Sequence, residues 1–294
     1  MSARAACICG SPLARKQFSE HFDALACARC GSTHFGARVG APAPEFEYGS
    51  GSEKYARRQY LYGKQLRWAH QWLLRQAWSG RKVAEVGCFN GFFLDELRKQ
   101  GADVYGYDVN EDALEVGRSL FALQGRLHQS LELVSKAGPF DDVICIDVLE
   151  HLDAPEDTLA LAELMLVPGG RISIAGPTIE RRFHDKSDYP PHHKWWFSRS
   201  GLATLCKSCG LDVCEMVIQR DPVLLARNVA GKVLHGIGRR EFFGEASVSP
   251  PAFIDGPVIT AAARAINTVM GHVLQGLGFS YCSTILIARK RANA

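Results

Sequence analysis

The residues that point most directly to chemistry in this sequence are two acids and two glycines between positions 85 and 108. Glu85, Gly87 and Gly91 follow one another in a stretch that begins with apolar residues, and Asp108 ends the next apolar segment. This spacing predicts a strand, a tight glycine turn, the start of a helix, and an acid at the tip of a second strand. An α/β sheet binds an adenosine-containing cofactor with this layout.

The glycine spacing also indicates which cofactor is bound. Dinucleotide sites have the pattern G-x-G-x-x-G, because the second glycine lets the backbone approach a pyrophosphate. Phe89 occupies that middle position in this chain. A ligand without phosphates, such as S-adenosylmethionine, does not need so close an approach. The sequence therefore predicts S-adenosylmethionine and leaves an NAD-dependent oxidoreductase as the weakest alternative.

Four of the ten cysteines form two pairs near the start of the chain, each pair followed by a glycine. They are Cys7, Cys9, Cys27 and Cys30. Two thiolate pairs on short turns can converge on a tetrahedral zinc ion, and four unligated thiols are the alternative. A ribbon of this size has almost no apolar core, so metal binding would supply much of its folding energy. Cys206 and Cys209 have no second pair, and core packing is expected for Cys206.

Composition narrows the class of protein. The chain has 294 residues and a formal net charge of +3, which gives no global field toward nucleic acid. Its first residues contain no apolar core of signal-peptide length, and no apolar run reaches the ~20 residues of a membrane span. With no secretion signal, the reducing cytosol is the expected compartment for so many cysteines. We therefore expect a cytoplasmic protein.

The remaining pattern predicts alternating strands and helices. The fold class expected is α/β: a doubly wound, Rossmann-like sheet of seven mostly parallel strands, preceded by a small zinc ribbon. The domains expected are a zinc ribbon (1–40), a linker with a leading helix over roughly 53–78 (41–80), and a cofactor-binding α/β domain (81–294) with a helical insertion (220–280). Strands are predicted at 82–86, 104–108, 126–129, 142–147, 171–175, 211–218 and 281–289. Further helices are predicted at 91–99, 110–123, 155–166 and 198–209.

In this order and spacing, the motifs resemble those of the class I S-adenosylmethionine-dependent methyltransferases. The resemblance covers about 80–290 and rests on 85–91, Asp108, 139–152, 168–170 and 196–210. The front cysteines resemble the zinc-binding module that precedes this domain in some sugar and secondary-metabolite methyltransferases. Two positions depart from the family pattern. Phe89 replaces the middle glycine, and Ser130 stands where many relatives carry an acid.

The resemblance implies roles for the cofactor-binding residues. Gly87 and Gly91 would let the loop fold beneath the methionine part of the cofactor, and Glu85 would stand near its ammonium group. Asp108 would accept hydrogen bonds from both ribose hydroxyls. The other cofactor-binding candidates are Cys88, Phe89, Val109, Asp147 and Val148.

Three histidines are candidates for the base that removes a proton from the acceptor. Histidine suits this role because its ordinary pKa lies near working pH. His151 follows the fourth predicted strand, and His192 and His193 lie on the loop after the fifth. In zinc-module sugar C-methyltransferases, a Glu-His pair occupies a similar place and its histidine is the proposed base. His193 matches that histidine, while His192 replaces the glutamate.

The segment 220–280 is larger than a minimal methyltransferase requires. Its part 222–240 combines an apolar stripe with basic residues, which permits a peripheral membrane contact. A helical pair packed on the sheet or on a second subunit of a homodimer is the plainer interpretation.

The sequence thus predicts a methyltransferase that acts on a small molecule or glycan, and it favours a nucleotide- or lipid-linked sugar or a secondary metabolite. A zinc-ribbon RNA-binding methyltransferase and a non-catalytic cofactor-binding partner are the alternatives. The ribbon carries few basic residues, so we expect no nucleic-acid partner.

Overall fold

The computed structural model describes residues 6–19, 21–37, 68–179, 190–220 and 282–292, with short helical pieces at 269–270, 272–274 and 276–277. The chain divides into two compact units. One comprises Met1–Ile179, Tyr189–Ile218 and Ser283–Ala294, and the other comprises Glu180–Asp188 and Gln219–Cys282. All of the elements that position the site belong to the first unit. No helix in the described part of the chain is long and apolar enough to cross a membrane.

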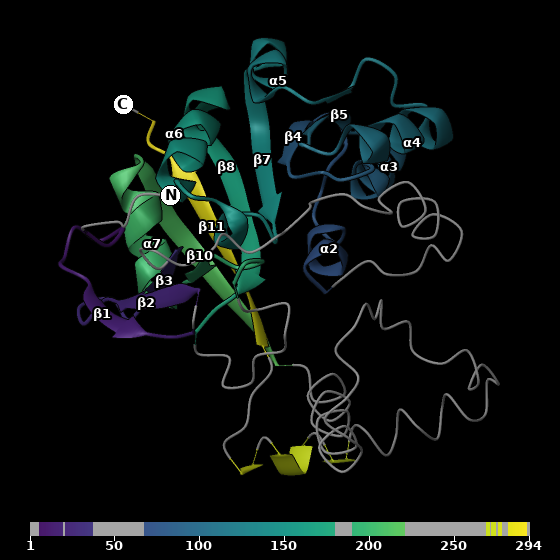
Figure 1. Cartoon of the computed structure of the whole chain (residues 1–294). Coiled ribbons are helices and arrows are strands. Elements are labelled where there is room, and N and C mark those ends of the chain that lie inside the picture. The colour runs from purple at the N-terminus through teal and green to yellow at the C-terminus, as the bar shows by residue number, and fades with distance from the viewer. Residues whose placement is uncertain are drawn as a thin grey trace. The chain divides into compact units, whose positions relative to one another are not determined.

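A seven-stranded sheet forms the centre of the first unit, with the strand order β10-β11-β8-β7-β4-β5-β6 (Figure 1). Neighbouring strands from β6 to β8 run parallel, and β11 runs antiparallel to β8. This arrangement confirms the predicted fold class. The strands are β4 (Lys82–Val86), β5 (Asp103–Tyr107), β6 (Leu127–His128), β7 (Phe140–Ile146), β8 (Leu166–Pro177), β10 (Leu211–Arg220) and β11 (Cys282–Lys290).

Helices cover both faces of this sheet. The core on one face joins the sheet to α5 (Leu131–Ala137), α6 (Pro155–Met165) and α7 (Arg199–Ser208). The core on the other face joins it to α2 (Trp68–Leu73), α3 (Phe92–Lys99) and α4 (Glu111–Phe121). The sheet needs helices on both sides because its central strands are apolar on both: in β7, Val143 and Cys145 pack into the first core while Ile144 and Ile146 pack into the second.

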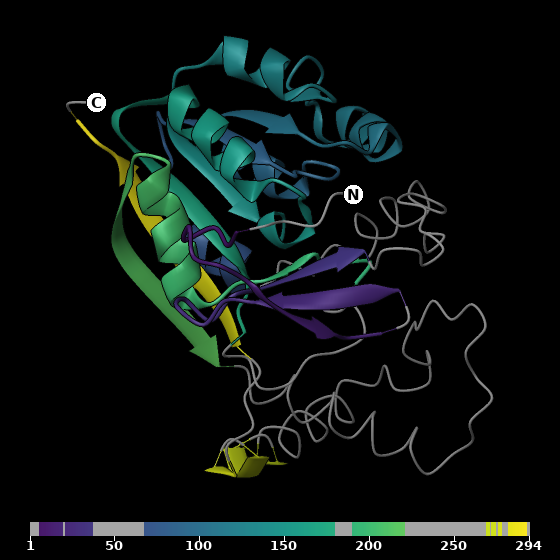
Figure 2. The ribbon, with the colours of Figure 1, turned by 60° about the vertical axis from the view of Figure 1, so that its left-hand side comes forward.

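The front of the chain forms a separate sheet with strand order β1-β2-β3-β9. Its first three strands are β1 (Ala14–Gln17), β2 (Phe22–Ala26) and β3 (Thr33–Ala37), drawn in purple in Figure 2. The fourth strand, β9 (Trp195–Trp196), comes from the loop that carries His192 and His193. The sequence did not predict this pairing, because β9 has only two residues and its partner lies far away in the chain.

Several predicted boundaries change. The leading helix predicted over 53–78 is described only as α2 and ends at Leu73, whose carbonyl accepts a hydrogen bond from Trp78 Nε1 at 2.7 Å. Its predicted part over 53–67 lies outside the described residues. Strand β8 begins at Leu166, directly after α6, rather than at 171. Helix α5 was not predicted; Ser130 is its N-cap, accepting from the amide of Leu133. The predicted insertion 220–280 lies almost wholly outside the described residues and stays a prediction.

Candidate active site

The parallel pairing of β4, β5 and β7 brings the predicted cofactor residues to one edge of the sheet. Val86 lies opposite Tyr107 on one side and Cys145 on the other. The residues that follow these three strands therefore leave the sheet side by side. Ligands of α/β proteins bind outside the carboxyl ends of the strands, which is where this edge lies.

Gly87 allows the turn after β4 to close. Its φ is +77°, and its amide and that of Cys88 both donate to Tyr107 O, at 2.7 and 2.9 Å. A Cβ atom on Gly87 would lie 2.3 Å from Val148 Cγ2. Only glycine meets both conditions, and the close contact places the segment after β7 directly against this turn.

The ring of Phe89 lies outside the glycine turn. Its backbone is left-handed (φ 51°), and its ring packs against Ala113 and Val116 of α4. Its amide donates to Asp108 Oδ2 at 2.7 Å. Phe89, which replaces the middle glycine, therefore packs its side chain on α4, and its backbone amide holds Asp108 at the tip of β5.

Glu85 is a buried acid, 3% exposed, near the end of β4. Within the described part of the chain, its Oε2 atom has no hydrogen-bond partner. Burial, and the neighbouring negative charge of Asp108, raise the pKa of Glu85 to about 8. A buried carboxylate is costly unless a cation pairs with it, so this position fits the ammonium group of S-adenosylmethionine.

Asp108 is held in place by backbone amides. Its Oδ2 accepts from Phe89 and its Oδ1 accepts from Asn110 at 2.9 Å. Burial raises the pKa of Asp108, while the amides of Asn110, Phe89 and Val109 oppose that rise. Each carboxylate oxygen can accept more than one hydrogen bond, so both can still receive a ribose hydroxyl.

Cys88, Asp147 and Val109 were also predicted to bind the cofactor. Cys88 is buried, and burial together with the charges of Glu85 and Asp108 raises the pKa of its thiol, so these three side chains lie close together. Asp147 has a left-handed backbone (φ 52°) directly after β7, a strained geometry that is common at functional sites. The side chain of Val109 is 62% exposed and lies least within the group.

A second group of polar side chains lies just beyond Val148. Glu150, His151 and His193 bring one carboxylate oxygen and two ring nitrogens within 4.8 Å of one another. Glu150 and His193 are buried, and the rings of His151 and His193 meet edge to face at 4.7 Å. Glu150 was not among the predicted site residues, although its position next to His151 in the sequence could have drawn attention to it.

The backbone fixes the orientation of this group. His151 Nδ1 lies 2.6 Å from the carbonyl oxygen of His192, which can only accept, so Nδ1 carries the proton and Nε2 is the basic atom. Lys194 donates its amide to Glu150 O at 2.7 Å. His192 thus contributes its carbonyl, and burial lowers the pKa of its side chain. The three side chains can transfer a proton, and their donor atoms are also of the type that binds a divalent cation.

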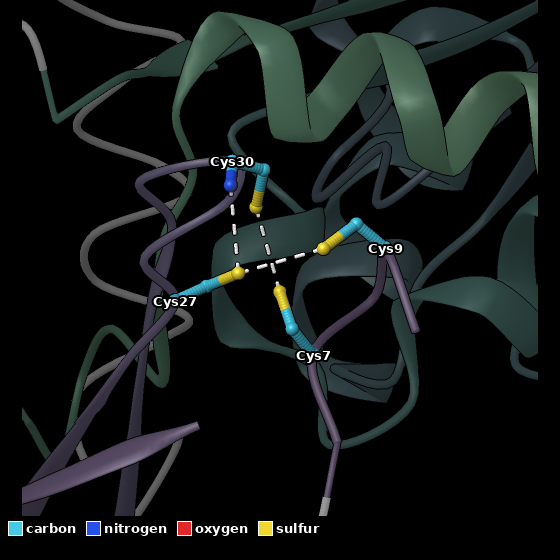
Figure 3. A group of neighbouring side chains, drawn as sticks. All are labelled: Cys7, Cys9, Cys27 and Cys30. Atoms are coloured by element: carbon cyan, nitrogen blue, oxygen red, sulfur yellow. Dashed lines mark hydrogen bonds between the residues drawn. The ribbon is translucent and has the colours of Figure 1, made fainter. Parts of the chain in front are cut away.

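The front cysteines form a compact group of four sulfurs that point toward one another (Figure 3). The Sγ–Sγ distances are 3.5 Å for Cys7 and Cys30 and 3.4 Å for Cys9 and Cys27. Tetrahedral zinc with Zn–S bonds of about 2.3 Å requires sulfurs about 3.8 Å apart. The four thiols therefore fit a zinc ion with only a small adjustment.

Comparison with known proteins decides the family. A family model described as a methyltransferase domain matches residues 56–216. The chain belongs to the methyltransferase domain family. Its cofactor is S-adenosylmethionine, as the glycine turn and the acids at the ends of β4 and β5 predict.

Individual relatives cover part of this methyltransferase chain. A ubiquinone biosynthesis O-methyltransferase of Aromatoleum aromaticum is 31% identical over 167 residues, which are 50% of this chain and 70% of that protein. One of Azoarcus sp. is 34% identical over 112 residues, covering 36% and 47%. The match thus spans less than half the length of the second relative. A phosphoethanolamine N-methyltransferase 2 of Haemonchus contortus shares the fold, with a TM-score of 0.51 at 10% identity over 95% of this chain and 71% of that one.

The cysteine group generates one testable prediction. We expect the purified protein to carry about one zinc ion per chain, measured by elemental analysis, and Cys27→Ser with Cys30→Ser to lose it. Cys209→Ser is the matched control, because Cys206 and Cys209 have the same spacing as Cys27 and Cys30 but lie on and after α7. Zinc retained by the double variant would show that these thiols do not bind it.

The raised pKa of Glu85 generates a second prediction. Because a cationic ligand favours the carboxylate, binding of S-adenosylmethionine near neutral pH should release a proton, and affinity should rise about ninefold from pH 6 to pH 7 and level off above pH 8. Calorimetry in buffers of different ionisation enthalpy measures both effects. Glu85→Gln should bind at least about tenfold more weakly and without this proton release. Unchanged proton release in the variant would exclude Glu85 as its source. Asp108→Ala should also weaken binding, and it should keep a proton release but move the pH dependence to lower pH, because the charge of Asp108 contributes to the raised pKa of Glu85.

Proposed function

We propose that this methyltransferase methylates a hydroxyl group of a small molecule or glycan, with Glu150, His151 and His193 on the acceptor side. The observation that supports this proposal most is the convergence of these three side chains next to the cofactor residues. Val148 contacts the Gly87 turn, and Glu150 follows it by two residues. A proton acceptor so close to the cofactor edge is what a hydroxyl acceptor requires.

S-adenosylmethionine supplies a methyl group that its sulfonium already activates. The protein's own residues then have to align the acceptor and take its proton. His193 is the proposed base, and the neighbouring carboxylate of Glu150 would stabilise the imidazolium that forms. His151 would orient the pair through its ring contact with His193 and through its bond to the His192 carbonyl.

Two acceptor classes follow from two different observations. The curated relatives are named for ubiquinone biosynthesis, which favours a small molecule with a methylated oxygen. The front of the chain with its four cysteines (6–37), which we call the cysteine module, resembles the zinc-binding module of sugar and secondary-metabolite methyltransferases. This resemblance favours a nucleotide- or lipid-linked sugar. Turnover assays with phenolic acceptors and with nucleotide sugars in parallel, with Asp108→Ala as the inactive control, distinguish the two. Turnover of neither class, with cofactor binding intact, would contradict the proposed acceptor.

The proposed base generates a third prediction. His193→Ala should lower kcat by at least about 100-fold, the scale of general base catalysis, while the Kd for S-adenosylmethionine stays within about twofold. His272→Ala, which removes an exposed histidine, is the matched control and should leave both unchanged. Unchanged kcat in His193→Ala would remove this assignment.

The same donor atoms suit a divalent cation, so a further measurement separates the two chemistries. If His193 is the base, turnover should persist after weakly bound divalent cations are removed under conditions that leave the cysteine-bound zinc in place. Loss of turnover that Mg²⁺ or Mn²⁺ restores would instead show that the group activates the acceptor through a cation.

A further inference from the structure

The loop that carries the proposed base is part of the cysteine module's sheet. In β9, Trp195 pairs with His34 and Trp196 pairs with Thr33 of β3. The amide of Phe35 donates to Lys194 O at 2.8 Å, which extends this ladder to the residue next to His193. The backbone on the carboxyl side of His193 is therefore set by a strand from the front of the chain.

A second junction joins the same loop to the cysteine turn itself. Ser32 follows the turn of Cys27 and Cys30, and its hydroxyl accepts from the amide of Ser198 at 3.0 Å. The hydroxyls of Ser198 and Ser200, at the start of α7, both donate to the carbonyl oxygen of Cys30, the second at 2.9 Å. The residues that end the histidine loop thus bond directly to the backbone of a cysteine.

This junction is closely packed and buried. Ser32 is 0% exposed and Ser198 is 4% exposed. A Cβ atom on Gly201 would lie 2.1 Å from Ser32 Oγ, so the first turn of α7 can approach the cysteine turn only because this residue is glycine. Between the junction and His193, the ring of Trp195 contacts His34 at 4.6 Å and stacks on Phe197 at 5.4 Å.

The other side of the loop contacts Glu150 and His151, two of the three residues proposed to lie on the acceptor side of the site. Lys194 bonds to Glu150 O, and the His192 carbonyl bonds to His151. Residues 192–198 therefore lie between the cysteine module and the carboxyl end of β7. A shift of the module on one side of the loop would move His193 relative to Glu150 on the other.

The apolar core around the cysteine turns is small. The core around them consists of Cys7, Cys27 and Cys30, with Ile8, Cys9 and Leu13 partly buried against it. Apolar burial on this scale is small, so in such modules metal binding supplies the folding energy. Without the ion, the turn that carries Cys30 and Ser32 would keep its hydrogen bonds from Cys27 N to Ser32 O and from Gly31 N to Cys27 O, but nothing would tie its sulfurs to those of Cys7 and Cys9, so its position would be less firmly fixed.

We infer that the cysteine-bound metal positions the active site: its occupancy fixes the Cys30–Ser32 turn, which through Ser198 and β9 holds His193 against Glu150 and His151. This inference rests on the proposed function for the catalytic role of His193. The physical coupling between the metal and the loop can be measured without an acceptor. Ser32 is accordingly a positioning residue, since it touches neither the cofactor residues nor the proposed base.

Ser32→Ala tests the coupling without altering a metal ligand. We expect full zinc content and unchanged affinity for S-adenosylmethionine, with at least about tenfold faster amide exchange at Ser198 and Lys194 and unchanged exchange in β4 and α3. With an acceptor in hand, kcat should fall while the KM for the cofactor does not change, and the pH–rate profile should shift because the surroundings of His193 have changed. Thr204→Ala, which removes an exposed hydroxyl bonded to Ser200 O within α7, is the control.

Zinc removal from the full chain by a chelator is the second arm. Selective loss of exchange protection over 192–198, reversed by added zinc, would support the inference. Unchanged exchange at Ser198 and Lys194, in either Ser32→Ala or the zinc-free protein, would overturn it. Failure of the proposed function has a different signature, because His193→Ala would then retain turnover while the exchange measurements still reported the coupling.

Discussion

The parallel pairing of β4 with β5 and β7 is the constraint on which the site depends. Parallel strands place their carboxyl ends at one edge, and their apolar side chains are shielded from water only when helices cover both faces. That single edge receives the Gly87 turn, the acid of β5 and the strained segment after β7. Each has limited freedom of its own: the Gly87 turn is packed against Val148, and Asp108 is held by amides. The predicted cofactor residues are thus positioned by backbone geometry more than by side-chain contacts.

A different kind of constraint positions the acceptor group. Glu150 and His151 come from the short segment after β7, but His193 comes from a loop whose far end belongs to another sheet. The side chains of these three residues meet only if the segment after β7 and the loop that carries His193 are held in the correct relative position. Hydrogen bonds from Ser198 and Ser200 to the Cys30 carbonyl help to fix that relative position. The front module therefore contributes to the geometry of this site through its hydrogen bonds to the loop that carries His193.

Sequence reasoning predicted best where local signals and long-range packing agree. The predicted helices 110–123 and 155–166 correspond to α4, which Asn110 caps through the amide of Ala113, and to α6, which begins at Pro155. The predicted strand 142–147 corresponds to β7, whose last four residues, 143–146, are all apolar. The four cysteines converge as their spacing predicted. Failures came where the deciding partner is distant or the segment is short. The pairing of Trp195 with His34 leaves no periodic pattern, and α5 is a single short helix that depends on the Ser130 cap. The end of α2 at Leu73 depends on the indole of Trp78, a contact that apolar periodicity does not encode.

The pairing of β3 with β9 has a consequence for the newly made chain. Because synthesis proceeds from the N-terminus at about 5–20 residues per second, Trp195 emerges roughly 10–30 seconds after His34. During that interval β3, with Phe35 at its centre, is an edge strand with no neighbour on one side, the kind of surface that invites pairing with another chain. The newly made module can therefore pair with other chains until the loop that carries His192 and His193 has been synthesised. Early zinc binding would reduce the number of misfolded structures that the module can adopt.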